Sequence, residues 1–303
     1  MTVETPETWT RHLRDVFDSA STPKELLVQA SELWHYRYCA NTWEYAIPVF
    51  RTRMSELWPT HRKETVVVSD LSGILHSCFH VQGCETEHAL KMLRNVYKAT
   101  SPSVFICAID NGRGKRDLHQ DYKAGREERP PEFYAMCEEV KSALRDRGVQ
   151  LEEHENIEAD DVMCSIAWRC QLIEQPCVLA TEDKDNWQAL GKNTALYSPR
   201  NKEYRNADWL LATHRIRPVQ CVDWVALVGG KNSLAGCKNV GEKRASDLLE
   251  AYGDFAGIVE RSSALSPKLR ENILEFEKVY DEMKALHTLR RDIPVGWNPG
   301  KRQ

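Results

Sequence analysis

The stretch VVVSDLSGILHSCFH, residues 66–80, decides the fold, because it opens with a short apolar run that ends in an aspartate. Short apolar runs of this kind are typical of buried strands. Four further runs follow along the chain, and segments with helical spacing of apolar residues separate them. The predicted strands are Val66–Ser69, Val104–Ile109, Val149–Leu151, Cys177–Ala180 and Ala195–Tyr197, and the predicted helices include 87–98, 132–147 and 159–172. Strands that alternate with helices predict an α/β fold with a parallel sheet covered on both faces.

The two flanks of this α/β region show only helical patterns. We therefore predict three parts, which are a helical extension over 1–62, an α/β core over 63–204 and an all-helical domain over 205–303. The helices expected in the last part are 207–214, 218–228, 242–252 and 267–290. The extension holds four tryptophans, which could bind an unknown protein partner. Packing of these aromatic rings onto the main domain is the simpler interpretation.

Length and composition are those of an ordinary globular protein of 303 residues with a net charge of −4. The first residues lack the basic and apolar regions of a signal peptide, and no apolar run approaches the roughly 18 residues that span a bilayer. We expect a cytoplasmic monomer that does not enter membranes, with its ten cysteines as free thiols. His76, His80, Cys84 and His88 are spaced four apart, but Gly83 would weaken such a helix, so packing or surface roles are favoured over a metal site.

Carboxylates gather where a parallel sheet binds its ligands, at the carboxyl ends of the strands. Two end strands, two follow the fourth strand and three open the helix after the third. Together they are Asp70, Asp110, Glu158, Asp160, Asp161, Asp183 and Asp185. Any single acid at a helix start could be a cap, but capping does not explain acids after three separate strands. Like charges at one edge need cations, and ligands that are all oxygen favour Mg²⁺ or Mn²⁺. The chemistry that such a site serves is phosphodiester hydrolysis with two ions.

A basic segment with an aromatic residue, DNGRGKRDLHQDYKAGREERPPEF, covers residues 110–133. Its cations, which are Arg113, Lys115, Arg116, Lys123, Arg126 and Arg129, could neutralise phosphates, and Tyr122 could stack on an unpaired base. Interleaved acids allow a plain solvated helix as well, so the segment alone does not decide between the two.

These segments together resemble the 5′-nuclease family, which includes the nuclease domain that precedes bacterial DNA polymerase I, phage exonucleases and flap endonucleases. The resemblance covers about residues 65–260. The matching segments, in the family's order, are DLSGILHSCFH, AID…YKAGR, IEADD, TEDKDNWQAL and DWVALVGG…LAGCKNVGEKRASDLLEAYG. The resemblance implies a parallel-sheet PIN-like nuclease core, followed by a helical domain with a helix-hairpin-helix (H3TH) motif.

The resemblance also assigns roles to single residues. The first five of the seven acids would hold one metal ion and bridge to a second, which Asp183 and Asp185 would hold. Lys123 and Arg126 would act with Asp160 in catalysis, at the scissile phosphate. The DNA-binding residues would be Arg116, Tyr122, Lys123, Arg126, Gly236, Lys238, Val240, Gly241, Lys243 and Arg244. The hairpin loop would grip the duplex through backbone amides, and the resemblance implies a K⁺ ion there as well.

The chain departs from the family pattern in two places. Gly230 and Asn232 stand where the family usually has two more aspartates, so the second metal site is expected to be the weaker one. The extension over 1–62 has no counterpart in the family.

The function predicted is a structure-dependent 5′-3′ exonuclease or flap endonuclease that acts on DNA with 5′ ends, flaps or nicks, in replication or repair. The alternatives are a non-catalytic binder of branched or nicked DNA and a PIN-like ribonuclease. Seven acids set against a polyanion argue against a mere binder, and the helical hairpin domain favours duplex DNA over RNA. The preference between exonuclease and flap cleavage, and between DNA and an RNA–DNA hybrid, stays open at this point.

Overall fold

The computed structural model describes residues 13–21, 65–79, 85–112, 114–117, 129–229 and 235–297, and four single residues at 26, 29, 49 and 53. Side chains 116 and 117 are not described. Among these residues, none of the helices is long and apolar enough to cross a membrane. Every cysteine in the described ranges is a free thiol, as the sequence predicts.

A six-stranded sheet forms the centre of the protein, in the order β3-β2-β1-β4-β5-β6. Its strands are β1 Val66–Asp70, β2 Val104–Ile109, β3 Gln150–Glu153, β4 Cys177–Ala180, β5 Thr194–Ser198 and β6 Glu203–Arg205. The first five strands are parallel, which confirms the predicted α/β fold. The sixth strand pairs antiparallel with β5 and was not expected. It is three residues long and largely exposed, so it carries no apolar run to reveal it.

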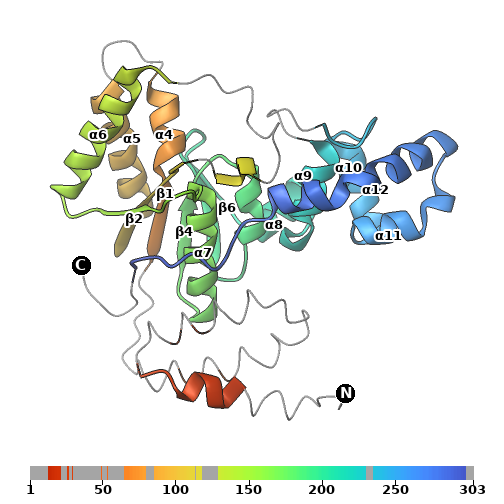
Figure 1. Cartoon of the computed structure of the whole chain (residues 1–303), viewed down its shortest axis with the longest axis horizontal. Helices are drawn as coiled ribbons and strands as arrows, with labels where there is room; N and C mark the ends of the chain where they lie inside the picture. Colours follow the sequence, from red (N-terminus) through yellow and green to blue (C-terminus); the bar gives the residue numbers. More distant parts are fainter. Residues whose placement is uncertain are drawn as a thin grey trace.

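Helices cover both faces of the sheet (Figure 1). They are α4 Leu71–Cys78, α5 Glu85–Thr100 and α6 Pro131–Arg145 on one face, and α7 Ala159–Leu172 on the other. Alternate residues of β1 point to opposite faces, as the pleat of a strand requires. Val67 packs with α4, α5 and α6 in one core, whereas Val66 and Val68 pack with α7 in a second core. Because α4 ends at Cys78 and α5 begins at Glu85, the His76 to His88 spacing does not lie on one helix.

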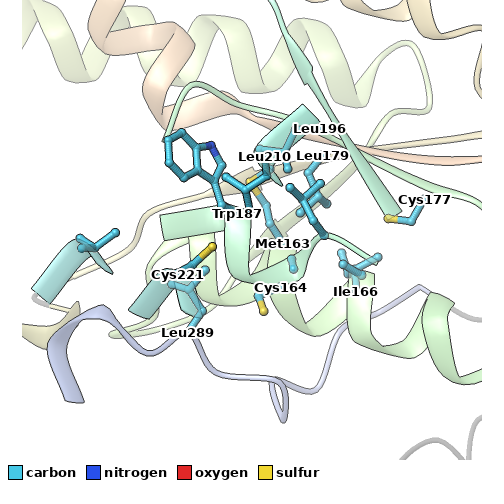
Figure 2. Packing of buried hydrophobic residues seen from close by; sticks show 14 of the residues in the cluster. Met163, Cys164, Ile166, Cys177, Leu179, Trp187, Leu196, Leu210, Cys221 and Leu289 are labelled. Carbon is cyan, nitrogen blue, oxygen red and sulfur yellow. The ribbon is translucent and has the colours of Figure 1, made fainter. Parts of the chain in front are cut away.

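The helical domain extends to one side of the sheet (Figure 1). Its helices are α8 Ala207–His214, α9 Cys221–Val228, α10 Glu242–Tyr252, α11 Phe255–Glu260 and α12 Pro267–His287. Short 3-10 turns connect several elements, namely η1 Gly114–Asp117, η2 Lys184–Ala189, η3 Pro218–Gln220 and η4 Ser262–Ala264. The core around α7 continues into this domain, where Trp187 of η2, Leu210 of α8 and Cys221 of α9 are all buried (Figure 2).

The segment after α12, residues 288–297, runs back past α7 towards the sheet (Figure 1), and we call it the C-terminal strap. Ser165 and Arg169 of α7 donate to the carbonyls of Arg290 and Ile293, at 3.2 and 2.9 Å. Further along, the Gly296 amide donates to Glu152 Oε1 on β3 at 2.8 Å. Leu289 of the strap is buried in the same core as Cys221 (Figure 2). The strap therefore fastens the helical domain to the α/β core.

The described part of the N-terminal region also packs on this core. Residues 13–18 are helical, and Leu13, Phe17, Ala20 and Leu26 are buried with the α7 cluster. Arg53 donates to the carbonyl of Ala20 at 2.9 Å. The tryptophans predicted to pin this region lie outside the described residues.

Candidate active site at the carboxyl edge of the sheet

Asp70 marks the point where β1 turns into α4. It is the N-cap of α4, and its Oδ1 accepts from the Gly73 amide at 2.7 Å. Its other oxygen, Oδ2, accepts from the hydroxyl of Thr181 after β4, at 3.2 Å. The cap fixes one oxygen at a helix N-terminus, which favours negative charge. The carboxylate is thereby held between the ends of two neighbouring strands.

Asp110 follows β2 and lies next to the start of α7. Its amide donates to Ser72 Oγ at 2.8 Å, and its Oδ1 accepts from the Ala159 amide at 2.7 Å. Glu158, the N-cap residue of α7, makes no capping bond with its own side chain. Asp110 therefore satisfies the first amide of α7 from another strand, which fixes the helix start against the end of β2.

Asp160 points towards the acids that follow β4. Asn186 Nδ2 donates to Asp160 Oδ1 at 2.5 Å, and this asparagine belongs to η2. Within the same turn, the Asp185 amide donates to Asp183 Oδ1 at 2.9 Å. The turn thus orders two carboxylates beside the first turn of α7.

The raised pKa values of two aspartates indicate which carboxylates lie close to one another. Burial raises the pKa of Asp160 well above its ordinary value, and the carboxylates of Asp183, Asp70, Asp110 and Asp185 raise it further. Burial and then Asp110 raise the pKa of Asp70 to about 7. We call these five residues, Asp70, Asp110, Asp160, Asp183 and Asp185, the five-carboxylate group. Each raised pKa reports that the anionic form is disfavoured until a positive charge neutralises the group.

The donor set of this group fits hard divalent cations, because every ligand atom it offers is a carboxylate oxygen. In the described part of the chain, no three His, Cys, Asp or Glu side chains are already grouped closely enough to hold a metal ion. A cation bound here would neutralise the mutual repulsion of the five carboxylates.

Asp161 lies apart from this group although it follows Asp160 directly. Its Oδ1 accepts from the Arg290 amide of the strap at 2.8 Å and lies 3.4 Å from Lys115 Nζ. Burial raises the pKa of Asp161, and Lys115 and the Arg290 amide oppose this effect. Lys115 also donates to the carbonyl of Thr288 at 3.0 Å and is itself buried. The charge of Lys115 is therefore used inside the protein, which favours a structural role for this residue over neutralisation of DNA phosphates.

Two further acids near the edge occupy different surroundings. Glu158 is buried against Gly114, where a Cβ atom would collide with the glutamate side chain and where φ is +54°. Glu182 turns away towards β5 and β6. Its Oε1 accepts from Ser198 Oγ at 2.7 Å and from the Arg200 amide at 2.9 Å. Glu182 therefore supports the β5–β6 hairpin.

The basic segment after Asp110 falls largely outside the described residues. Tyr122, Lys123 and Arg126 belong to the undescribed residues 118–128, and the side chain of Arg116 is not described either. Their predicted contacts with DNA stay predictions. The same holds for Gly230 and Asn232, and for the K⁺ ion expected at that loop.

Two glycines flank the loop that leads into α10, and they differ in surroundings. A Cβ atom on Gly236 would collide with the backbone of Val228 and Gly229, so this glycine permits close packing against the end of α9. A Cβ atom on Gly241, the N-cap residue of α10, would meet nothing within 4 Å. Gly241 therefore leaves open space in front of the α10 N-terminus.

The other residues predicted to bind DNA around this loop also fall into an internal and an exposed set. Val240 is buried and its amide donates to the Cys237 carbonyl at 3.0 Å, so this amide is used inside the protein, and the predicted DNA contact of Val240 stays a prediction. Lys238, Lys243 and Arg244 are exposed around the loop. From η2, Lys184 Nζ reaches Glu242 Oε1 on α10 at 2.7 Å, which links the loop to the turn that carries Asp183 and Asp185.

His287, the last residue of α12, is a site residue that the sequence did not reveal. Its Nδ1 lies 3.3 Å from Asp185 Oδ2. The two residues are 102 positions apart and belong to different parts of the predicted domain plan, so no local pattern pairs them. Thr181 and Asn186, which contact the five-carboxylate group, lie inside the segment TEDKDNWQAL and were detectable as part of that motif.

Two family models match consecutive parts of the chain. Residues 65–214 match the 5′-3′ exonuclease N-terminal resolvase-like domain, and residues 216–302 match the 5′-3′ exonuclease C-terminal SAM fold. Among curated proteins, a flap endonuclease Xni of Colwellia psychrerythraea is 27% identical over 182 residues, which is 60% of this chain and 62% of the relative. A thermostable DNA polymerase I of Thermus aquaticus is 31% identical over 193 residues, 62% of this chain and 23% of the polymerase. The chain thus spans less than two thirds of the length of these relatives.

Solved structures share the fold at low sequence identity. The phage T5 D15 protein, co-crystallised with metal ions, covers 76% of this chain and 90% of its own length, with a TM-score of 0.63 and 17% identity. The catalytic core of Rad2 in complex with DNA substrate covers 79% of this chain and 86% of its own, with a TM-score of 0.51 and 16% identity. These similarities extend over both the sheet and the helical domain.

Proposed function

Because this chain belongs to the 5′-3′ exonuclease family, whose two domain models match residues 65–214 and 216–302, we propose that it is a metal-dependent nuclease that hydrolyses DNA phosphodiester bonds. The reaction proposed is structure-dependent 5′-3′ exonuclease or flap endonuclease cleavage. The observation that carries the proposal is the five-carboxylate group at the carboxyl edge of the sheet, in which four acids lie close enough to the half-buried Asp160 to raise its pKa.

The five-carboxylate group would hold the divalent ions, Mg²⁺ or Mn²⁺, and Glu158 is a further oxygen donor beside it. When bound, two such ions would supply a Lewis acid for the phosphoryl group and lower the pKa of the attacking water. The protein's own contribution is orientation. Asp70 and Asp110 are fixed by bonds from the Gly73 and Ala159 amides, so their carboxylates are arranged before substrate arrives.

Asp161 has a different role in this proposal. Its charge is compensated by Lys115, which is buried with it, and by the Arg290 amide, whose contact is half-buried. A carboxylate that is neutralised within the protein gains little from a metal ion. We therefore assign Asp161 to fastening the C-terminal strap, and this replaces the metal-ligand role that the family resemblance implies.

The start of α10 would bind the backbone of duplex DNA. Gly241 leaves the helix N-terminus open, no side chain caps it, and a helix N-terminus favours phosphate. Lys238, Lys243 and Arg244 add positive charge around it. Because backbone contacts fix register without reading sequence, such a clamp suits an enzyme that recognises DNA structure rather than base sequence.

The basic segment would act at the scissile phosphate. We keep Lys123 and Arg126 as the cations expected to stabilise charge there, and Tyr122 as a stacking surface for an unpaired base. Two structural relatives support DNA and metal as ligands, since the Rad2 core is described with DNA substrate and the T5 D15 protein with metal ions. Cleavage of 5′ flaps and nicked ends is a step that DNA replication and repair require.

The test is cleavage of three 5′-labelled substrates, a flap, a nicked duplex and a single strand, by the purified full chain. Each is incubated with Mg²⁺, with Mn²⁺ or with EDTA, beside the variant Asp160→Asn. The proposal expects short labelled products that require the metal and disappear in the variant. Binding of the flap without cleavage in either metal would instead support a non-catalytic DNA binder. Cleavage confined to a labelled RNA strand of the same sequence, incubated in parallel, would support a ribonuclease. Cytoplasmic location and a monomeric state stay predictions from the sequence.

A further inference from the structure

We infer that His287 is a positioning residue for Asp185, through which the helical domain sets the orientation of one metal-binding carboxylate. The inference rests on the proposed function, because it assigns Asp185 to the metal site. It concerns the last residue of α12, which is 7% exposed and lies at the junction between this helix and the strap.

The contact fixes both partners. His287 Nδ1 lies 3.3 Å from Asp185 Oδ2. With the carboxylate oxygen as the acceptor, the ring donates through the hydrogen on Nδ1. The second ring nitrogen, Nε2, is buried and has no hydrogen-bond partner among the described residues. A buried polar atom without a partner costs free energy. The hydrogen bond from Nδ1 to Asp185 is therefore the one polar contact of the ring among the described residues, and it sets the orientation of the ring.

The backbone on both sides is tied by a third residue. Gln188 Nε2 donates to the carbonyl of Asp185 at 2.8 Å and to the carbonyl of His287 at 2.9 Å. Its Oε1 accepts from the Leu289 amide at 3.0 Å, and the side chain is buried. Gln188 therefore holds η2 and the end of α12 together, which keeps the His287 ring beside the Asp185 carboxylate.

Asp185 differs from the other carboxylates in where its support comes from. Asp70, Asp110 and Asp160 accept hydrogen bonds from residues of the α/β core, namely Gly73, Ala159 and Asn186. Asp185 accepts from the helical domain. Because Oδ2 faces His287, Oδ1 is the oxygen left to turn towards an ion. Partners that orient metal-binding carboxylates in this way typically contribute 10- to 100-fold to metal affinity.

A purely structural histidine is the competing explanation, and the chain contains a matched example. His154 Nε2 lies 2.9 Å from Glu152 Oε2, and Glu152 also holds the strap through the Gly296 amide. This pair supports the strap but is not part of the five-carboxylate group. His154→Phe therefore reports what loss of a strap-supporting histidine does by itself.

The experiment compares the wild-type chain with His287→Phe, His287→Asn and His154→Phe. Phenylalanine keeps a ring without a donor, whereas asparagine places an amide close to the position of Nδ1. Four quantities are measured, which are Mn²⁺ binding by calorimetry, the Mn²⁺ concentration for half-maximal flap cleavage, flap affinity in EDTA and Tm in EDTA. We expect His287→Phe to weaken Mn²⁺ binding and raise the required Mn²⁺ concentration by about 10-fold or more. His287→Asn should stay close to wild type, and flap affinity in EDTA should not change.

The outcomes separate this inference from the proposed function. If wild type binds Mn²⁺ and cleaves but His287→Phe has the same Mn²⁺ dependence, the positioning role is overturned and the nuclease stands. An equal change in His154→Phe would also overturn it, because the effect would then belong to the strap. If wild type neither binds Mn²⁺ nor cleaves, both fall. Should His287→Phe fail to fold, His287→Asn is compared with His287→Gln, whose amide lies one bond further out. Equal Mn²⁺ dependence of those two variants would contradict the inference.

Discussion

Asp160 lies among four other carboxylates, whereas Asp161, the next residue of α7, lies against a lysine and a backbone amide. Asp161 is buried and Asp160 is half-buried, and in both burial raises the pKa. The two aspartates differ in whether a positive group of the protein neutralises their charge. Asp161 has its positive partner inside the protein, so it stabilises the fold. The charge on Asp160 is uncompensated by the described residues around it, and such a charge is suited to bind an external cation.

The largest expected effect comes from neutralising Asp160. Asp160→Asn removes one ligand from the five-carboxylate group and should reduce single-turnover flap cleavage by about 10²–10³-fold or more, the scale of losing one preorganised charge. The same change relieves repulsion, so Tm in EDTA should rise rather than fall. Rapid-quench cleavage and calorimetric melting measure the two effects. A variant with normal turnover would remove Asp160 from the metal site.

The opposite pattern is expected at Asp161. Asp161→Asn leaves the Lys115 charge buried without its partner, which typically costs about 3–5 kcal/mol of unfolding free energy. Cleavage below the melting transition should change much less than in Asp160→Asn. Urea unfolding measures the loss.

A double substitution sharpens this prediction. Lys115→Met combined with Asp161→Asn should recover part of the stability, because the unpaired buried charge is gone. Strictly additive losses in the two single variants and the double variant would mean that the two side chains do not act as a pair.

Divalent metal should stabilise the wild type and leave Asp160→Asn almost unaffected. Ions that bind only the folded state at 100 times their Kd raise the unfolding free energy by about 2.7 kcal/mol. Asp161→Asn should keep this response, since its carboxylate is not assigned to the ions. Melting curves with and without Mn²⁺ measure all three proteins. The assignment of the two aspartates would be reversed if Asp161→Asn lost the response and Asp160→Asn kept it.

The smallest effect is expected in the clamp, where Gly241 and Gly236 repeat the contrast between an open and an internal position. A Cβ atom at position 241 meets no protein atom within 4 Å, so Gly241→Val should lower Tm only by the modest cost of losing a favourable N-cap residue, while duplex affinity falls about 10-fold through blocked access to phosphate. Gly236→Ala collides with the backbone of α9 and should lower Tm instead. Fluorescence anisotropy in EDTA and thermal melting separate the two. Unchanged duplex affinity in Gly241→Val would remove the α10 N-terminus from the clamp.

The sequence predicts the sheet well because local signals define it. β2 and β4 are apolar throughout and β1 begins with three valines, while Asp70 ends β1 and Asp110 directly follows β2. The topology of a parallel sheet then brings those acids to one edge. The sixth strand escapes prediction because it has no apolar run, and its partner in β5 defines it instead.

The sequence does not predict which acid meets which partner. Lys115 and Asp161 are paired only because η1, α7 and the strap meet in space, and the strap residues Thr288 and Arg290 are more than a hundred positions away. The contact between His287 and Asp185 depends on the same long-range packing. Periodicity and motif spacing describe local structure, so contacts made by a returning segment become visible only in the fold.

The measurement that tests the account most directly is single-turnover cleavage of a 5′-labelled flap by Asp160→Asn and Asp161→Asn, side by side in Mn²⁺. Both proteins are held well below the lower of their melting temperatures, so that stability does not enter. The account predicts that Asp160→Asn cleaves at least about 100-fold more slowly than Asp161→Asn. Equal rates for the two variants would contradict the division between a metal-binding and a fastening aspartate.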